Sequence, residues 1–275
     1  MNLHDIQFIF NRAVYLSFNK KKLLFVSIIL MLCGLMVIFF RGLAVDAGNW
    51  VVMSLTFLPI FLCAAVLLST GIILVRIYHD EIKRKNVNYL EILNKSWELI
   101  IGASYFSIPI ILSYLILWML MGIFLLLREI PGVGEFFGVI LSFGPFLINL
   151  GSLMLCVLNI SMLFFVAPVV ALRGLNRLAI SQILINRLRR DIFSNTCLAL
   201  VATFPLVFFV GLLSLAAFLT GTTCITCHKP VYTVLQWFFI MIPFTALLSP
   251  AVIFFFNFAA ESHVLMQKQL EKKNA

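Results

Sequence analysis

The most specific chemical motif in the sequence is Cys224-Ile225-Thr226-Cys227-His228. A C-x-x-C-H spacing attaches c-type haem, with thioether bonds to both cysteines and the histidine as an iron ligand. Two cysteines at this spacing also suit a local disulfide or a pair of metal ligands. The connection that holds the motif, Thr220–Val231, is too short to enclose a haem by itself. We therefore expect a disulfide or a free dithiol there, with no cofactor and no metal ion.

Few other side chains in the long apolar runs are suited to chemistry. No Asp, Glu, Lys or Arg falls in the middle of a run, whereas ion-coupled transporters commonly carry carboxylates or histidines there. Four amide side chains lie in the runs: Asn149, Asn159, Gln236 and Asn257. Hydrogen bonds between helices would account for them, and a solute path is the alternative. We assign no catalytic residue, because the sequence shows no nucleophile–base arrangement or phosphate-binding glycine loop.

The remaining titratable and thiol groups are given structural roles. Glu261 and His263 are two residues apart near the end of the last apolar run, which places them on different faces of a helix. We expect both at the membrane interface. The cysteines within apolar runs are expected to pack as small apolar side chains; they are Cys33, Cys63, Cys156 and Cys197.

The composition is that of a membrane protein. Of 275 residues, 63% are hydrophobic and 11% are charged, against about half and a quarter in a soluble domain. All but three of the 20 basic residues lie in the segments 1–22, 76–98, 172–191 and 261–275. Cytoplasmic connections carry such an excess. The pattern predicts a multi-pass membrane protein with both termini in the cytoplasm, and it argues against nucleic acid as a partner.

Six apolar runs are long enough to cross a bilayer, which takes about 20 helical residues. We place them at about 23–40, 50–75, 100–127, 146–167, 196–219 and 234–259. The chain 1–275 is thus expected to be a single all-α integral membrane domain with six transmembrane helices. The run Phe136–Leu172 is too long for one straight span, and Gly144 and Pro145 interrupt it. We expect 136–144 to be an interfacial or re-entrant piece.

Three amphipathic segments, 1–22, 80–98 and 172–193, are expected to lie on the cytoplasmic face. We assign the arginines of the third to the membrane surface; they are Arg173, Arg177, Arg187, Arg189 and Arg190. Basic residues near an anionic leaflet are attracted to its headgroups. We therefore expect membrane lipids, including anionic headgroups, as partners, and a protein partner at this face is a further hypothesis. Leu178, Ile180 and Leu188 would add apolar burial in lipid.

The order of elements suggests three repeated units, each an interfacial helix followed by a transmembrane hairpin. Three apolar–Asn–basic triplets stand just before the hairpins, namely Phe10-Asn11-Arg12, Leu93-Asn94-Lys95 and Ile185-Asn186-Arg187. The second helix of each hairpin ends with a similar triplet: Gly71-Ile72-Ile73, Pro168-Val169-Val170 or Pro250-Ala251-Val252. Repeats of this kind occur in many membrane folds, and a chance match in an apolar sequence is the alternative.

One local run connects the chain to known families. Ala167-Pro168-Val169-Val170 leads into an amphipathic segment with the small residues Ala179 and Ser181. Together with the order of interfacial helices and broken spans, it resembles the six-span bacterial membrane families that include YciC and the membrane domain of glycerophosphodiester phosphodiesterases. The resemblance implies a fold and a location in the bacterial inner membrane, and it implies little chemistry.

These features favour a non-enzymatic scaffold, assembly factor or accessory subunit. A transporter of a neutral or amphiphilic solute, with its path at the broken helices of spans 4 and 6, is the first alternative. A membrane redox protein that uses Cys224 and Cys227 is the second.

The predicted topology can be tested by labelling single cysteines in intact cells with a reagent that does not cross the membrane. Cysteines at Asn49 or Lys229 should react, because both positions fall in predicted outer connections. A cysteine at Asn88 should stay unlabelled until the cells are opened, and its labelling in intact cells would refute the orientation.

Overall fold

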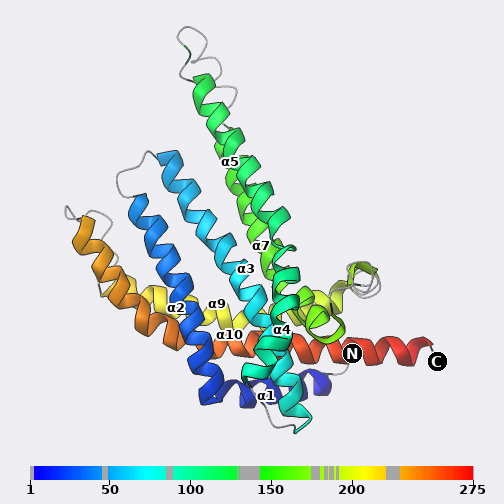
Figure 1. Cartoon of the computed structure of the whole chain (residues 1–275). Helices are drawn as coiled ribbons and strands as arrows, with labels where there is room; N and C mark the ends of the chain where they lie inside the picture. Colours follow the sequence, from blue (N-terminus) through cyan, green and yellow to red (C-terminus); the bar gives the residue numbers. More distant parts are fainter. Residues whose placement is uncertain are drawn as a thin grey trace.

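The computed structural model of the chain is helical almost throughout (Figure 1). It describes residues 3–44, 49–84, 89–128, 130, 143–174, 180–182, 185, 189, 192–220 and 230–274. A short helix, α1 (Leu3–Tyr15), and a 3-10 turn, η1 (Leu16–Phe18), lead into α2 (Lys20–Leu43). The other helices in chain order are α3 (Asn49–Ile82), α4 (Tyr89–Ser104), α5 (Ile108–Arg128), α7 (Gly144–Arg173), α9 (Ile192–Leu219) and α10 (Pro230–Asn274).

Six helical stretches are long and apolar enough to cross a membrane, as the sequence predicts. They run over Lys20–Leu43, Ser54–Ile82, Glu91–Leu127, Gly144–Arg173, Ile192–Leu219 and Val234–Gln267. We call the end of the molecule that carries α1 and α4 the basic end, and the opposite end the far end. At the basic end α3 and α10 continue beyond their predicted boundaries. The first charged residues beyond those boundaries are Arg76 and Glu261. Each has a polar partner within the protein, Ala171 for Arg76 and Arg12 for Glu261, so the helices can continue past them inside the protein.

The third predicted span is divided into two helices. Of the segment expected over 80–98, the residues up to Ile82 belong to α3, and α4 begins at Tyr89. α4 continues to Ser104 instead of giving way to a span at residue 100. Residues 105–107 form a turn. α5 begins at Ile108, and Pro109 stands in its first turn, where a missing N–H removes no helical hydrogen bond. The predicted boundary was wrong because apolar composition alone does not mark where a helix turns.

α7 begins at the predicted break, with Pro145 in its first turn. Residues 136–142, most of the predicted re-entrant piece, lie outside the described part of the chain. At the basic end α7 continues beyond the predicted boundary at Ala167 to Arg173. Gly174 ends it, because its φ of 83° is a left-handed conformation that glycine adopts without steric cost.

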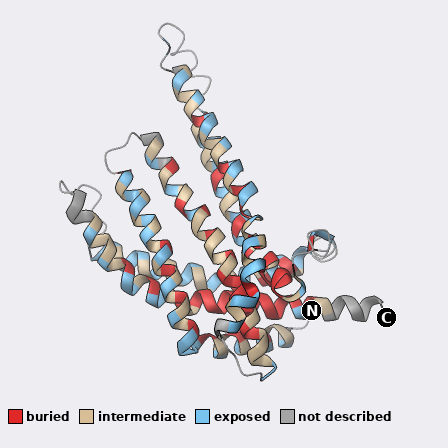
Figure 2. Ribbon diagram, viewed as in Figure 1, coloured by how far each residue is buried: buried red, intermediate tan, exposed pale blue. Residues whose placement is uncertain are grey.

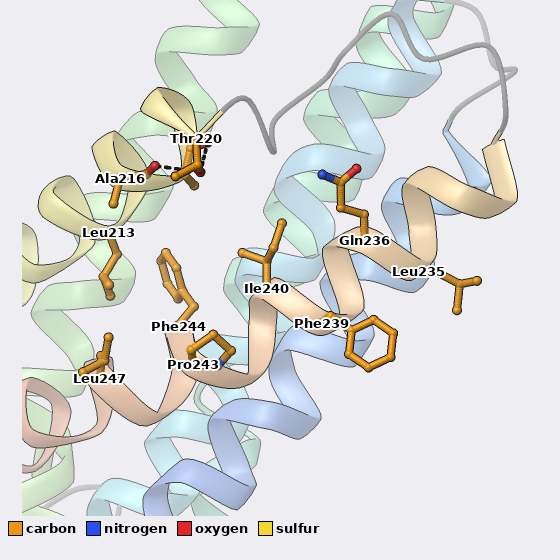
Figure 3. A pocket seen from close by; sticks show the side chains of 11 residues that line it. Leu213, Ala216, Thr220, Leu235, Gln236, Phe239, Ile240, Pro243, Phe244 and Leu247 are labelled. Atoms are coloured by element: carbon orange, nitrogen blue, oxygen red, sulfur yellow. Dashed lines mark hydrogen bonds between the residues drawn. The ribbon is translucent and has the colours of Figure 1, made fainter.

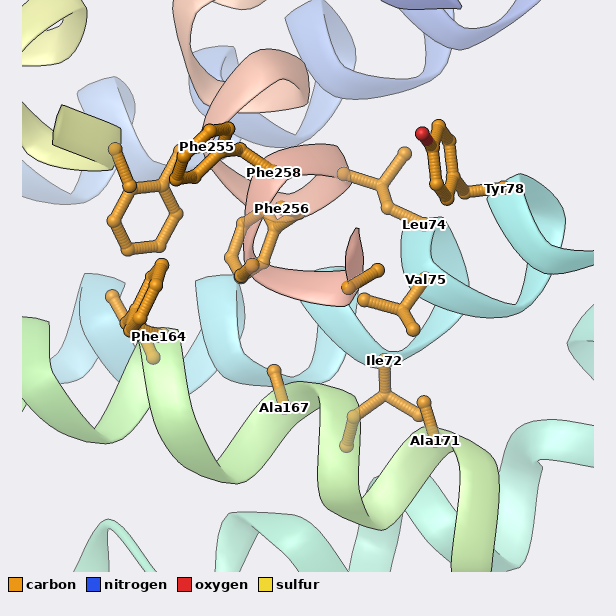
Figure 4. Close-up of a cluster of buried hydrophobic side chains, with 14 of the residues drawn as sticks. Ile72, Leu74, Val75, Tyr78, Phe164, Ala167, Ala171, Phe255, Phe256 and Phe258 are labelled. Atoms are coloured by element: carbon orange, nitrogen blue, oxygen red, sulfur yellow. The ribbon is translucent and has the colours of Figure 1, made fainter. Parts of the chain in front are cut away.

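The buried core lies at the basic end (Figure 2). Buried side chains concentrate in three segments, 72–78 of α3, 163–171 of α7 and 251–263 of α10. The rings of Phe164 and Phe255 meet edge to face, with centroids 5.9 Å apart (Figure 4). These segments contain or adjoin the three triplets that the sequence shows near the ends of the second hairpin helices, so the triplets meet in one core.

The far halves of the helices are mostly uncovered. In α7, the side chains of Phe146, Met154 and Val157 are each more than half exposed, whereas almost every residue from Leu163 to Ala171 is buried. Lipid chains are as apolar as leucine, so packing such side chains against other helices brings no hydrophobic gain in a bilayer. Uncovered far halves are therefore compatible with a stable fold in a membrane.

α1 packs on the core through its apolar face. Ile9 and Ala13 are buried, and the ring of Phe10 meets that of Phe254 edge to face at 5.1 Å. The opposite side of α1 and η1 keeps three aromatic residues exposed: Phe8, Tyr15 and Phe18. The amphipathic pattern of this segment thus serves protein packing on its apolar side.

Ile180 corrects part of the lipid-contact prediction for 172–193. Its side chain is 1% exposed and belongs to the same core cluster as α3, α7 and α10. Ile180 therefore packs on protein rather than lipid. Leu178 and Leu188 lie outside the described residues.

Gly71 is a direct probe of this packing. A Cβ added at Gly71 would lie 2.2 Å from Cε1 of Phe256, and the Phe256 ring is buried. We expect Gly71→Ala to lower the free energy of unfolding by about 1–3 kcal/mol, the usual cost of overpacking. Thermal unfolding of the purified protein in detergent measures the change.

Gly122→Ala is the matched control, because a Cβ at that helical position meets nothing within 4 Å. Replacing a helical glycine by alanine without a clash should leave stability unchanged or raise it. Equal unfolding temperatures for the two variants would contradict the close contact of α3 with α10.

Candidate functional site

The structure describes only part of the set of residues that the sequence singles out. Cys224, Cys227 and His228 lie outside the described residues, so the disulfide there stays a prediction. Three of the surface arginines also lie outside them: Arg177, Arg187 and Arg190. Arg173 and Arg189 are exposed, and their contact with lipid stays a prediction as well.

A cluster of polar side chains lies at the basic end, and three of them, Lys22, Tyr78 and Glu261, are buried. We call it the polar cluster; its members are Arg12, Asn19, Lys22, Tyr78, Glu81 and Glu261. The side chain of Lys22 is wholly buried, and its ammonium group forms an ion pair with Oε2 of Glu81. Asn19 Nδ2 donates to the other oxygen, Oε1, at 3.0 Å. A charge in an apolar surrounding needs such a close partner.

The N-terminus of α2 explains why a carboxylate is required here. Three consecutive lysines, 20–22, occupy its first turn, where positive charge opposes the helix dipole. Asn19 caps the helix, since its side chain accepts the backbone N–H of Lys21 at 3.2 Å. α3 packs along α2 and brings Glu81 to this end. The carboxylate therefore offsets both the Lys22 ammonium and the positive end of α2.

Tyr78 connects this ion pair to α10. Lys22 Nζ lies 5.5 Å from the centre of the Tyr78 ring, within cation–π range. The Tyr78 hydroxyl donates to Oε1 of Glu261 at 2.7 Å. Arg12 of α1 approaches the same oxygen through Nε at 3.4 Å. One chain of polar contacts thus joins α1, α2, α3 and α10.

Asn257, one turn before Glu261, makes a second connection between α10 and α1. Its Nδ2 donates to the carbonyl oxygen of Ala13 at 3.4 Å and to Oγ of Ser17 at 3.3 Å. These bonds confirm that Asn257 makes contacts between helices. The side chain is fully buried, and its Oδ1 accepts no hydrogen bond from the described residues.

Glu261 and His263, which the sequence predicts at the membrane interface, are buried inside the protein. They are 8% and 3% exposed, because α10 is buried on all sides at this level. Lys22 is likewise inside the protein and not among the surface bases. The sequence held a usable signal: Tyr78 and Glu81 are three residues apart and so share a face of α3.

Arg76 forms a separate polar junction at the same end. Its Nε donates to the carbonyl oxygen of Ala171 at 3.2 Å, in the last turns of α7. Its Nη1 donates to Oγ of Ser96 on α4 at 2.9 Å. Carbonyls at a helix C-terminus lack helical donors and attract cations. Arg76 therefore holds the basic ends of α4 and α7 against α3.

An apolar cleft opens between α9 and α10 at the far end (Figure 3). Its volume is about 670 Å³, within the usual range for small-molecule sites. Along α10 it is lined by Phe239, Ile240, Pro243, Phe244 and Leu247, which face Leu213 and Ala216 of α9. Thr220 and Gln236 stand where the two helices approach the connecting loop, so the polar groups lie at one end of the cleft.

Packing elsewhere on α9 and α10 explains why this face stays open. Leu198 and Ala202 fix the basic end of α9 in the core, where both are fully buried. The opposite face of α10 packs on α2, with Met241 seated against Gly34. Phe239 and Pro243 line the cleft that remains between α10 and the far half of α9.

The described residues contain no group of three or more His, Cys, Asp or Glu side chains that could hold a metal ion. The Cys63 thiol donates to the carbonyl oxygen of Cys33 at 3.5 Å, a contact that packs α3 against α2.

Comparison with known proteins finds no matching family model, no matching curated protein and no matching solved structure. The resemblance drawn from the sequence stays a prediction, and function has to be argued from the cluster and the cleft.

Replacing Lys22 tests whether the buried pair carries charge. Lys22→Met keeps an unbranched apolar stem and leaves the Glu81 carboxylate buried without its ammonium partner. We expect the free energy of unfolding to fall by about 3–5 kcal/mol. Denaturant unfolding of the purified protein measures this loss.

Glu91→Gln is the matched control, because Glu91 and Lys95 form an exposed ion pair within α4. Its loss should be about 0.3–0.5 kcal/mol. Combining Lys22→Met with Glu81→Leu should recover most of the stability, since no charge is then buried alone. A Lys22→Met variant as stable as the control would rule out a buried ion pair.

Proposed function

We propose that the chain is a multi-pass protein of a bacterial inner membrane, with both termini in the cytoplasm, that binds a neutral amphiphile from the bilayer. Six helices long and apolar enough to span a membrane support the first part. The concentration of basic residues in alternate connections supports the orientation. In this orientation the exposed Arg173 and Arg189 are available to anionic headgroups.

The packing of the helices also supports three repeated units. The second helices of the three hairpins, α3, α7 and α10, contact one another. The first helices, α2, α5 and α9, each pack on the second helix of their own hairpin. The same relation thus recurs three times around one core, as expected if each unit is an interfacial helix with a hairpin.

The cleft between α9 and α10 carries the functional proposal. Its deeper part is lined by aliphatic and aromatic side chains, such as Phe244 and Leu247, which suit a hydrocarbon chain. Gln236 offers an amide at the end nearest the loop, and the Thr220 hydroxyl, which donates to the Ala216 carbonyl, can accept a hydrogen bond there. None of the lining side chains that the structure describes is charged, so a neutral headgroup fits better than an ion.

Pro243 adds another polar group to the cleft. Proline has no N–H, so the carbonyl of Phe239, four residues earlier, loses its helical donor. Both residues line the cleft, and Gln236 lies one turn farther towards the loop. A headgroup with a hydroxyl or amide can donate to this carbonyl and accept from the Gln236 amide. This chemistry favours a neutral alcohol or amide amphiphile.

A scaffold or accessory subunit is the second candidate. The observation that favours it is the closed packing of α3, α7 and α10 at the basic end. A second cavity, beside Tyr114 and Asn149, has a volume of about 20 Å³, which suits about one water molecule. A carrier has to open the basic end to release a solute, whereas a scaffold does not. The redox alternative depends on Cys224 and Cys227, outside the described residues.

Filling the cleft should displace the amphiphile. Ala216→Trp places an indole among the lining residues, whereas Leu215→Trp changes an exposed neighbour on α9 that does not line the cleft. We expect protein purified from its native membrane in mild detergent to retain a neutral amphiphile detectable by native mass spectrometry. Ala216→Trp should lose most of this ligand and Leu215→Trp should retain it.

Gln236→Leu provides an independent arm. Loss of one hydrogen bond to the headgroup should weaken retention by roughly tenfold, the equivalent of about 1.4 kcal/mol. Equal retention by the two tryptophan variants would contradict ligand binding in the cleft. Wild-type protein without any neutral amphiphile would contradict it as well, and either result would favour the scaffold function.

A further inference from the structure

Exposed basic residues gather where α2 begins and α3 ends. Asn19 Nδ2 donates to Oε1 of Glu81 at 3.0 Å, so the start of α2 lies against the last turn of α3. Lys20 directly follows Asn19, whereas Lys83 and Arg84 directly follow α3. All three basic residues are exposed. We call them the basic junction; they place positive charge at the ends of two candidate membrane spans.

The carboxylates beside the basic junction are already engaged by other groups. Glu81 accepts from Asn19 and lies against the buried ammonium group of Lys22. Asp80 interacts electrostatically with Arg76. The three residues of the basic junction form no ion pair within the described part of the chain. Their charges are therefore available to an external anion.

Arg84 has a backbone conformation that glycine adopts more easily. Its φ of 53° lies in the left-handed region, and it is the one non-glycine residue in the described ranges with a positive φ. Its N–H donates to the carbonyl oxygen of Glu81 at 3.0 Å and so closes the end of α3. Glycine would make this backbone bond without the steric cost of a Cβ. Helix capping therefore does not explain an arginine here, whereas a role for its guanidinium group does.

Two exposed aromatic rings adjoin the basic junction. Tyr15 and Phe18 are 81% and 63% exposed, and Phe18 directly precedes Asn19. Tyr15 lies on the side of α1 opposite Ala13, which packs in the core. Tyrosine rings are enriched at the level of lipid headgroups, and phenylalanine rings bury at the boundary of the acyl chains. Rings and cations together suit an anionic amphiphile.

We propose that the basic junction, with Tyr15 and Phe18, is a binding site for an anionic phospholipid in the leaflet at the basic end. The Arg84 guanidinium has a planar fork of N–H donors that suits bidentate contact with a phosphate group. Lys20 and Lys83 add positive charge that attracts an anionic headgroup. The site is separate from the cleft, which lies at the far end, and from the arginines of 172–193.

A lipid fits this face better than a protein partner does. The exposed apolar stripe of α2 begins one turn after Lys20, at Leu24, and repeats at Ile28 and Leu32. Acyl chains can lie along this stripe while the headgroup stays at the basic junction. Lysine is depleted in protein interfaces, whereas an anionic leaflet attracts it. The basic junction is thus continuous with the surface that α2 offers to lipid.

Photo-crosslinking of the full-length protein in mild detergent tests the site. The probe is phosphatidylglycerol with a photoreactive group beside its headgroup, used below saturation, and the labelled residues are mapped by peptide mass spectrometry. Label should appear in 15–20 and in 83–84. A matched phosphatidylcholine probe, which has no net charge, should label the same residues much less. Added inorganic phosphate should not displace the lipid, because it has no acyl chains to contact α2 and the rings.

Arg84→Gly separates lipid binding from folding. Its unfolding temperature in detergent should not fall appreciably, because relief of the left-handed strain offsets the added freedom of the unfolded chain. Labelling by the phosphatidylglycerol probe should nevertheless fall by about fivefold, which corresponds to about 1 kcal/mol for one basic residue near an anionic surface. Lys20→Gln should give a similar loss. Lys95→Gln is the matched control and should label as the wild type does, because it removes an exposed charge that Glu91 already holds.

Phe18→Ser tests the aromatic rings and should weaken labelling by both probes by a similar factor, because the ring contacts acyl chains rather than charge. Full labelling of Arg84→Gly would overturn the proposal, as would equal labelling by the two probes or displacement by inorganic phosphate. Equal labelling together with a protein that co-purifies with the wild type but not with Phe18→Ser would assign the face to a protein partner instead. Ala216→Trp, which fills the cleft, should leave this labelling unchanged, so the failure of one proposal does not decide the other.

Discussion

The Lys22 ammonium has no access to water, and its burial is tolerable because Glu81 lies against it. The rest of the basic end depends on this contact. It sets the start of α2 beside the end of α3, and Tyr78 then reaches Glu261 on α10. Arg12 draws α1 onto the same carboxylate. Apolar side chains fit together in many ways, whereas a buried charge has few acceptable partners. The polar cluster therefore selects one arrangement of α1, α2, α3 and α10 from those that apolar packing would permit.

The helices pack differently at the basic end, where the cluster lies, and at the far end. At the basic end, 163–171 of α7 and 251–263 of α10 are buried almost completely, as in the core of a soluble protein. At the far end the helices expose most of their apolar surface. A space of about 670 Å³ lies between α9 and α10 at the far end. The proposed amphiphile site is a consequence of this uneven packing, because lipid can reach a cleft that protein leaves uncovered.

The six helices that are long and apolar enough to cross a membrane could be predicted from the sequence, because a helical run of about 20 apolar residues matches the thickness of the hydrocarbon core. Residues at the ends of the runs were harder to assign. Lys22, Glu81 and Glu261 resemble surface residues in the sequence, and only the approach of distant helices shows that they pair. Ile180 was assigned to lipid because an amphipathic pattern gives an apolar face but does not say whether lipid or protein covers it. The apolar face of α1 shows the same ambiguity, since Ile9 and Ala13 contact protein. The cleft itself was not predicted, although Gln236 and the broken helix of the last predicted span were named as an alternative solute path.

The most direct test of a packed basic end and an uncovered far end is a scan of oxygen accessibility with single spin labels along α7, in protein reconstituted into lipid bilayers. Oxygen concentrates in the hydrocarbon region, so a label that faces lipid gives a high value. From 146 to 160 the oxygen accessibility should be high on average and should rise and fall with the helical period. Its maxima should lie near Met154 and Val157. From 163 to 171 they should be low at every position. A helical period of equal amplitude along the whole of α7 would show that one face meets lipid throughout, and it would contradict a core confined to the basic end.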